Sequence, residues 1–70
     1  MIIKSKDLLL FEPDALKAEY VTGIKYSYYI MAYKNGQKFY IQGFDSEKEA
    51  REKLNILNEA VKKGKTVLEI

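Results

Sequence analysis

The sequence predicts a single α+β domain in which an antiparallel sheet of four to five strands carries one C-terminal helix on one face. Two observations lead to this class. Asn35-Gly36 stands between two strand-like segments, and a capped amphipathic segment follows them at residues 47–63. Seventy residues leave room for one domain, covering residues 1–70. The expected topology is a meander, either open or curled toward a small barrel.

The N-terminal third contains shorter strand signals. Ile2-Ile3 and residues 8–11 are rich in strand-forming side chains, and Pro13-Asp14 favours a turn. In residues 15–21 the apolar side chains alternate as in a strand, although Ala, Lys and Glu favour a helix. We favour a strand, because Thr22-Gly23 then provides a natural link to the next segment.

The strongest short-range signal is Asn35-Gly36. Both central positions of a type I′ turn have positive φ, which Asn and Gly tolerate better than other residues. The pair therefore predicts a hairpin with a two-residue loop. Its strands are expected at about 24–34 and 37–44, which are both rich in Tyr, Ile and Phe.

The segment after the hairpin predicts an amphipathic helix over 47–63. Ser46 and Glu49 form the S-x-x-E capping box at its start, and Lys62-Lys63-Gly64 provides cations and a glycine at its end. The apolar residues fall on one stripe at spacings of four, three and four: Ala50, Leu54, Leu57 and Val61. Residues 66–70 are expected to add an edge strand.

The composition excludes several classes of function. The chain has no Cys and no His, which excludes Cys/His zinc sites, disulfides and every Ser-His or Cys-His catalytic arrangement. The helix carboxylates alternate with lysines as on a solvated face, and the four glycines form no phosphate-binding pattern. We therefore expect a non-catalytic protein with no metal, no cofactor and no small-molecule substrate.

The expected location is the cytoplasm. The longest apolar run, at residues 8–11, is far shorter than the roughly 20 residues of a membrane span. Lys4, Lys6 and Asp7 interrupt any signal-peptide core, and cysteine is absent. These observations favour a soluble cytoplasmic protein with no membrane partner.

The two-residue loop also fixes the register of the hairpin, because side chains alternate between the two faces of each strand. The register predicts one almost wholly apolar face for the helix to cover. Its members are Tyr26, Tyr28 opposite Gly43, Ile30 opposite Ile41, and Ala32 opposite Phe39.

The opposite face of the hairpin is also aromatic. Its predicted pairs are Ser27 with Phe44, Tyr29 with Gln42, Met31 with Tyr40, and Tyr33 with Lys38. A solvated sheet face normally carries Thr, Glu, Lys and Ser instead. Although the net charge of the chain is only +2, residues 24–44 contain three lysines and no acidic residue. Some structure or partner must therefore account for this face.

Three explanations compete, because one helix covers only one side of a sheet. The N-terminal strands fold over the second face and bury its tyrosines. Alternatively, the face is a protein interface, within a homodimer or with another protein, since Tyr and Met are enriched at interfaces. The third explanation is single-stranded nucleic acid, with tyrosines stacked on bases and lysines near phosphates.

We favour the protein interface, with single-stranded nucleic acid as the alternative. The sequence does not distinguish a second copy of this chain from a different protein as the partner. Both functions use the same predicted binding residues: Tyr29, Met31, Tyr33, Lys38 and Tyr40, together with Lys25 and Lys34.

Residues 42–50, Gln-Gly-Phe-Asp-Ser-Glu-Lys-Glu-Ala, connect the tyrosine-rich hairpin to the capped helix. This joint is similar to one in small bacterial and phage proteins of unknown function. The resemblance covers about residues 24–63 and implies a β-meander followed by a capped helix, a phage or mobile-element origin, and no transferable activity. The element order and the Lys/Tyr hairpin also resemble small single-strand-binding proteins of the transcriptional-coactivator type, but this chain has only one arginine, Arg51.

Overall fold

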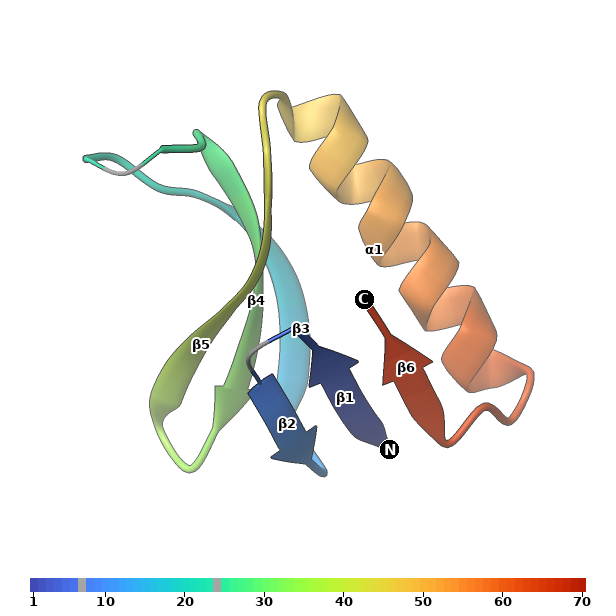
Figure 1. Cartoon of the computed structure of the whole chain (residues 1–70). Helices are drawn as coiled ribbons and strands as arrows, with labels where there is room; N and C mark the ends of the chain where they lie inside the picture. Colours follow the sequence, from blue (N-terminus) through green and yellow to red (C-terminus); the bar gives the residue numbers. More distant parts are fainter. Residues whose placement is uncertain (7, 24) are drawn as a thin grey trace.

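The computed structural model describes residues 1–6, 8–23 and 25–70. Within them it shows an α+β fold with six strands in two three-stranded sheets and one helix (Figure 1). The elements are β1 (Ile2–Ser5), β2 (Leu8–Phe11), β3 (Ala15–Tyr20), β4 (Tyr28–Lys34), β5 (Gln37–Phe44), α1 (Glu47–Lys62) and β6 (Val67–Glu69). Ile24, where we expected the first hairpin strand to begin, lies outside the described residues.

The strands do not form the single meander that we predicted. The small sheet has the order β2-β1-β6, and the large sheet has the order β3-β4-β5. The large sheet is antiparallel throughout, whereas β6 pairs with β1 in parallel. The predicted edge strand near the C-terminus is confirmed, and it pairs with the N-terminal strand. Neither sheet closes into a barrel.

A corner at residues 12–14 separates the two sheets. Glu12 has a positive φ of 47° and donates its amide proton to the Met1 carbonyl, which ends the first hairpin. Pro13 has no amide proton with which to extend the ladder. The Asp14 amide then donates to the Tyr33 carbonyl at 2.7 Å, which begins the pairing with β4. The chain therefore changes sheets here instead of continuing one meander.

The hydrophobic core lies on one face of the large sheet. Ile30 and Ala32 of β4 are fully buried there. They pack in one cluster with Ile3 and Leu68 from the small sheet and Leu57 from the helix. The helix and the small sheet therefore cover the same face of the large sheet. The explanation in which the N-terminal strands bury the outer tyrosines is wrong.

The helix confirms the local sequence signals. The Ser46 hydroxyl accepts a hydrogen bond from the Glu49 amide at 3.3 Å, and α1 ends one residue before the predicted Lys63. Ala50, Leu54 and Leu57 lie on the packed side. Val61 is 39% exposed, and Ala60, three residues after Leu57, packs on the core in its place. No helix in the described part of the chain is long and apolar enough to cross a membrane.

The hairpin register is confirmed near the turn and wrong farther from it. Asn35 and Gly36 both have positive φ, as a type I′ turn requires. The observed pairs of the first half match the prediction: Met31 with Tyr40, Ala32 with Phe39, and Tyr33 with Lys38.

Beyond Met31 a β-bulge adds Ile41 to β5 and shifts the pairing by one residue. The predicted pairs that involve Ile41, Gln42, Gly43 and Phe44 are therefore all wrong. In the structure Ile30 pairs with Gln42, Tyr29 with Gly43, and Tyr28 with Phe44.

Candidate functional site

The outer face of the large sheet, turned away from the helix, carries most of the predicted binding residues. We call it the tyrosine face. Residues alternate between the two sides of a strand, so the side chains next to the buried Ile30 and Ala32 of β4 point outward. The face comprises Lys17 and Glu19 from β3, Tyr26 from the β3–β4 connection, Tyr29, Met31 and Tyr33 from β4, and Lys38 and Tyr40 from β5.

Three tyrosines on this face form a continuous series of edge-to-face contacts. The ring centroids of Tyr26 and Tyr29 are 6.0 Å apart at an interplanar angle of 75°, and those of Tyr29 and Tyr40 are 5.2 Å apart at 82°. Each such pair contributes about 0.5–1.5 kcal/mol beyond its buried area. Met31, between Lys17 and Tyr40 in the sheet, is only 1% exposed, whereas Tyr40 is 53% exposed. The face is therefore a small, ordered aromatic layer with an open Tyr40 ring.

Gly43 makes room for this layer. A Cβ atom at Gly43 would lie 2.3 Å from Cδ2 of Tyr26 and 2.9 Å from its Cβ. The bulge places Gly43 opposite Tyr29, so the Tyr26 ring lies over the glycine and beside Tyr29. Our prediction that Tyr26 belongs to the apolar inner face is wrong. The register shift places Gly43 opposite Tyr29 on the outer face, and the space left by its missing side chain holds the Tyr26 ring there.

Three neighbouring side chains contact Tyr33. Its hydroxyl donates to the Glu19 carboxylate. The Nζ atoms of Lys17 and Lys38 lie 5.3 and 5.8 Å from its ring centroid, within cation–π range. The hydrogen bond to Glu19, together with partial desolvation and the nearby negative charge, raises the pKa of Tyr33 to about 12. Tyr33 is therefore neutral and fixed in orientation over the physiological pH range.

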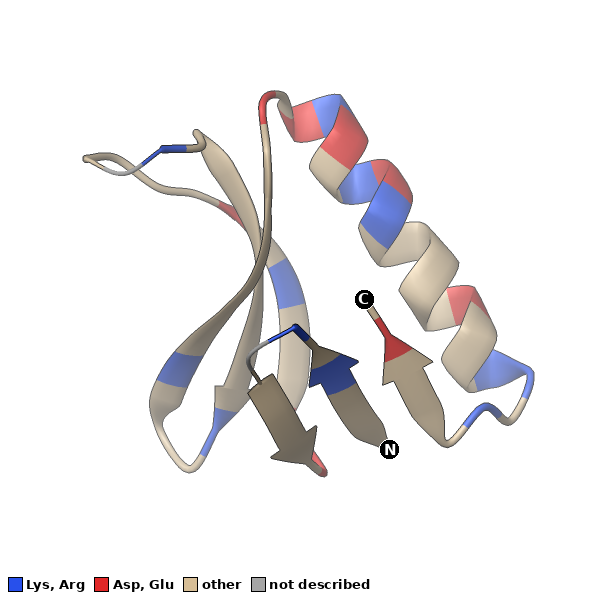
Figure 2. Ribbon diagram, viewed as in Figure 1, with Lys and Arg blue, Asp and Glu red and all other residues tan. Residues whose placement is uncertain are grey.

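The remaining predicted lysines lie in different places. Lys25 places its Nζ 5.2 Å from the Tyr26 ring centroid, at the edge of the tyrosine face. Lys34 instead donates to the Phe11 carbonyl at the corner between the sheets. Figure 2 shows the lysines of β3 and β5 on the large sheet, while the helix carries mixed charges along its length. The structure thus groups Lys25 and Lys38 with the tyrosines and separates Lys34 from them.

Sequence reasoning missed the contribution of β3 to the face. Lys17 and Glu19 alternate with Leu16 and Ala18, and this alternation was the available signal. The predicted meander placed this strand beside the hairpin, but the alternation did not reveal its register with β4. That pairing sets Lys17 opposite Met31.

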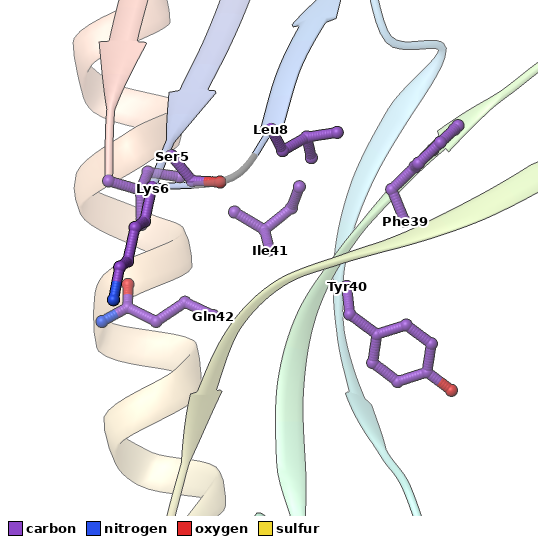
Figure 3. Close-up of a pocket in the computed structure, with 8 residues that line it drawn as sticks. Ser5, Lys6, Leu8, Phe39, Tyr40, Ile41 and Gln42 are labelled. Carbon is purple, nitrogen blue, oxygen red and sulfur yellow. The ribbon is translucent and has the colours of Figure 1, made fainter.

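A separate open cavity lies between the end of the small sheet and β5 (Figure 3). Its volume is about 450 Å³, and its lining includes Lys6, Leu8, Phe39, Ile41 and Gln42. The buried side-chain oxygen of Gln42 has no hydrogen-bond donor among the described residues. Those residues also contain no group of three or more His, Cys, Asp or Glu side chains suited to a metal ion. The described residues of its lining offer apolar contact surface and one lysine.

Comparisons of the chain with protein-family models, with curated proteins and with solved structures found no match. The resemblance of residues 24–63 to small bacterial and phage proteins therefore stays a prediction. The chemistry of the tyrosine face is the basis for a functional proposal.

Proposed function

We propose that the protein is a non-catalytic binding module whose tyrosine face contacts a protein partner. The supporting observation is the fixed series Tyr26, Tyr29 and Tyr40 on a sheet face turned away from the helix and the small sheet. Tyr and Met are enriched in protein interfaces, where large rigid rings provide contact area. The exposed Tyr40 ring is the expected anchor.

The order within the face favours binding. A side chain that is already held in one orientation loses less conformational entropy when a partner docks. Contacts with Tyr29 restrict Tyr40, and contacts with Glu19, Lys17 and Lys38 restrict Tyr33. A partner therefore meets a surface that needs little rearrangement.

Charge indicates the chemistry of the partner. The described residues on or beside the face include three lysines: Lys17, Lys25 and Lys38. They include one acidic residue, Glu19, whose carboxylate already accepts a hydrogen bond from the Tyr33 hydroxyl. Complementary charge speeds association and selects among partners. We expect an acidic protein surface with apolar groups that contact Tyr40.

Single-stranded nucleic acid is the second candidate, because lysine ammonium groups lie beside two tyrosine rings. Base stacking needs an open ring face. Neighbouring lysines flank the Tyr33 ring, and edge-to-face contacts engage Tyr26 and Tyr29, so Tyr40 is the more open ring of the series. This arrangement leaves less stacking surface than the tyrosine count suggests, and for this reason we favour a protein.

Photo-crosslinking in the cell tests the proposal. The photoreactive residue p-benzoylphenylalanine replaces Tyr40 in one variant and Tyr20 in a control. Tyr20 is 65% exposed but points to the other side of the large sheet, next to Tyr28. We expect a discrete protein adduct from position 40 and none of that mass from position 20. Equal adducts from both positions, or none from position 40, would contradict the proposal.

Titration with labelled single-stranded oligonucleotides at two salt concentrations tests the alternative. The protein proposal predicts no binding even at low salt. Binding that weakens steeply with salt and disappears in Tyr40→Ala would instead establish the nucleic-acid function.

A further inference from the structure

Four strands form the edges of the two sheets, and three of these edges are protected. β3 carries Lys17 and Glu19 and packs against the helix. β5 carries Lys38 and the bulge at Ile41. β6 runs beside α1 (Figure 1). A groove of about 340 Å³ lies between them, and Val67 helps to line it. Charges, bulges and covering elements are the usual means by which proteins prevent edge pairing.

The fourth edge, β2, differs from these: within the described residues it has no bulge, and its one cover is Lys34, which donates to the Phe11 carbonyl at its end. Its sequence is Leu8-Leu9-Leu10-Phe11, and it alone among the six strands of the described residues carries no charged side chain. Leu9 and Phe11 are 56% and 53% exposed. Both side chains point to the outer face of the small sheet, away from the buried Leu10.

Every second residue of β2 directs its backbone amide and carbonyl groups to this edge. Leu10 pairs with Ile3, and the Glu12 amide donates to the Met1 carbonyl, so these residues direct their polar groups toward β1. In an antiparallel pair the residues between them direct theirs the other way. Leu9 and Phe11 therefore present amide and carbonyl groups outward. Lys34 donates to the Phe11 carbonyl, which has a second lone pair available.

We propose that β2 pairs in antiparallel fashion with β2 of a second copy of this chain, which joins two small sheets into one of six strands. The two-fold axis passes beside Leu10. Leu9 then lies opposite Phe11 of the partner subunit, and Phe11 opposite Leu9 of the partner subunit. The outward backbone groups of these residues form hydrogen bonds across the axis, and their four side chains form one apolar cluster.

The β2 strand is complementary to itself. A two-fold axis places the same patch on both sides of the interface, so each contact is made twice. Cross-strand pairs that involve an aromatic ring stabilise sheets. Because β2 carries no charge, the pairing brings no like charges of the two strands together. The dimer leaves both tyrosine faces outside the interface and presents two copies of the proposed binding site.

Analytical ultracentrifugation over a range of concentrations tests this dimer. We expect the mass to rise from 8.1 kDa toward twice that value. Leu9→Lys should keep it at the monomer value, because the new ammonium group meets the apolar cluster. Val67→Lys is the matched control: it changes the same outer face on the opposite edge strand and should still dimerise.

A wild-type protein that stays monomeric at high micromolar concentration would overturn the proposal. Loss of the dimer in Tyr40→Lys, but not in Leu9→Lys, would assign self-association to the tyrosine face and would also overturn it. If Leu9→Lys fails to fold, amide hydrogen exchange of the wild-type protein tests the dimer instead. The Leu9 and Phe11 amides should exchange more slowly as concentration rises, and concentration-independent exchange would contradict the dimer.

Discussion

Neither the tyrosine face of the large sheet nor the outer face of the small sheet is covered by another element of the described residues, but the two faces are built differently. On the tyrosine face, aromatic rings contact one another, and Met31 is only 1% exposed. On the small sheet, Leu9, Phe11 and Val67 are each more than 40% exposed. The first face offers ordered side chains, whereas the second offers an unprotected backbone edge. Two exposed sheet faces of one small protein can therefore differ in how far their side chains are packed.

The largest expected difference between the faces is in stability. Met31→Ala should lower the free energy of unfolding by about 2–5 kcal/mol, because it removes a buried side chain. Leu9→Ala should change it by about 0.5 kcal/mol or less, since Leu9 is largely exposed. Urea denaturation of the two variants, at a concentration where the protein is monomeric, measures both values. Equal losses would show that the tyrosine face is not the packed layer described above.

A substitution at Gly43 should give the next largest loss of stability. Gly43→Ala places a methyl group within 2.3 Å of the Tyr26 ring, and such overpacking typically costs about 1–3 kcal/mol. In a Tyr26→Ala background the same substitution should cost much less, because the obstructing ring is absent. A double-mutant cycle by urea denaturation measures this coupling. Additive effects would place the Tyr26 ring away from Gly43.

Ionisation of Tyr33 gives a smaller, pH-dependent effect. Its pKa is raised to about 12 in the folded protein, against an ordinary value of 10.0. The folded state therefore holds this proton more tightly. The associated stability is fully present below pH 10 and is lost as the pH rises toward 12.

Ultraviolet titration of tyrosinate checks this assignment. Glu19→Gln should move the latest-titrating tyrosine back toward its ordinary pKa, because the hydrogen bond to a carboxylate and its negative charge are removed. Phe in place of Tyr33 should eliminate that late transition. A titration curve that is unchanged in Glu19→Gln would contradict the contact.

Local signals in the sequence predicted the elements well. The positive φ values required at Asn35-Gly36 and the capping box at Ser46 each depend on neighbouring residues, and both predictions are confirmed. Because the turn sets the nearby register, the placement of Met31, Tyr33 and Tyr40 on one face was also predictable.

Long-range pairing was not predictable in the same way. Nothing in the local sequence fixes the position of the bulge at Ile41, so every pair beyond it was wrong. The pairing of β1 with β6 joins the two ends of the chain. Lys17 and Glu19 reach the tyrosine face only through the pairing of β3 with β4. The contact of Lys34 with the Phe11 carbonyl, in the other sheet, was also not visible in the sequence.

Photo-crosslinking from positions 40 and 9 in the same cells tests the central claim most directly, since these residues represent the two faces. With p-benzoylphenylalanine at position 40, the tyrosine face should give an adduct with a different protein. At position 9, the β2 edge should give an adduct of twice the chain mass. The absence of any heterologous adduct from position 40, or the same products from both positions, would contradict a protein-binding function of the tyrosine face.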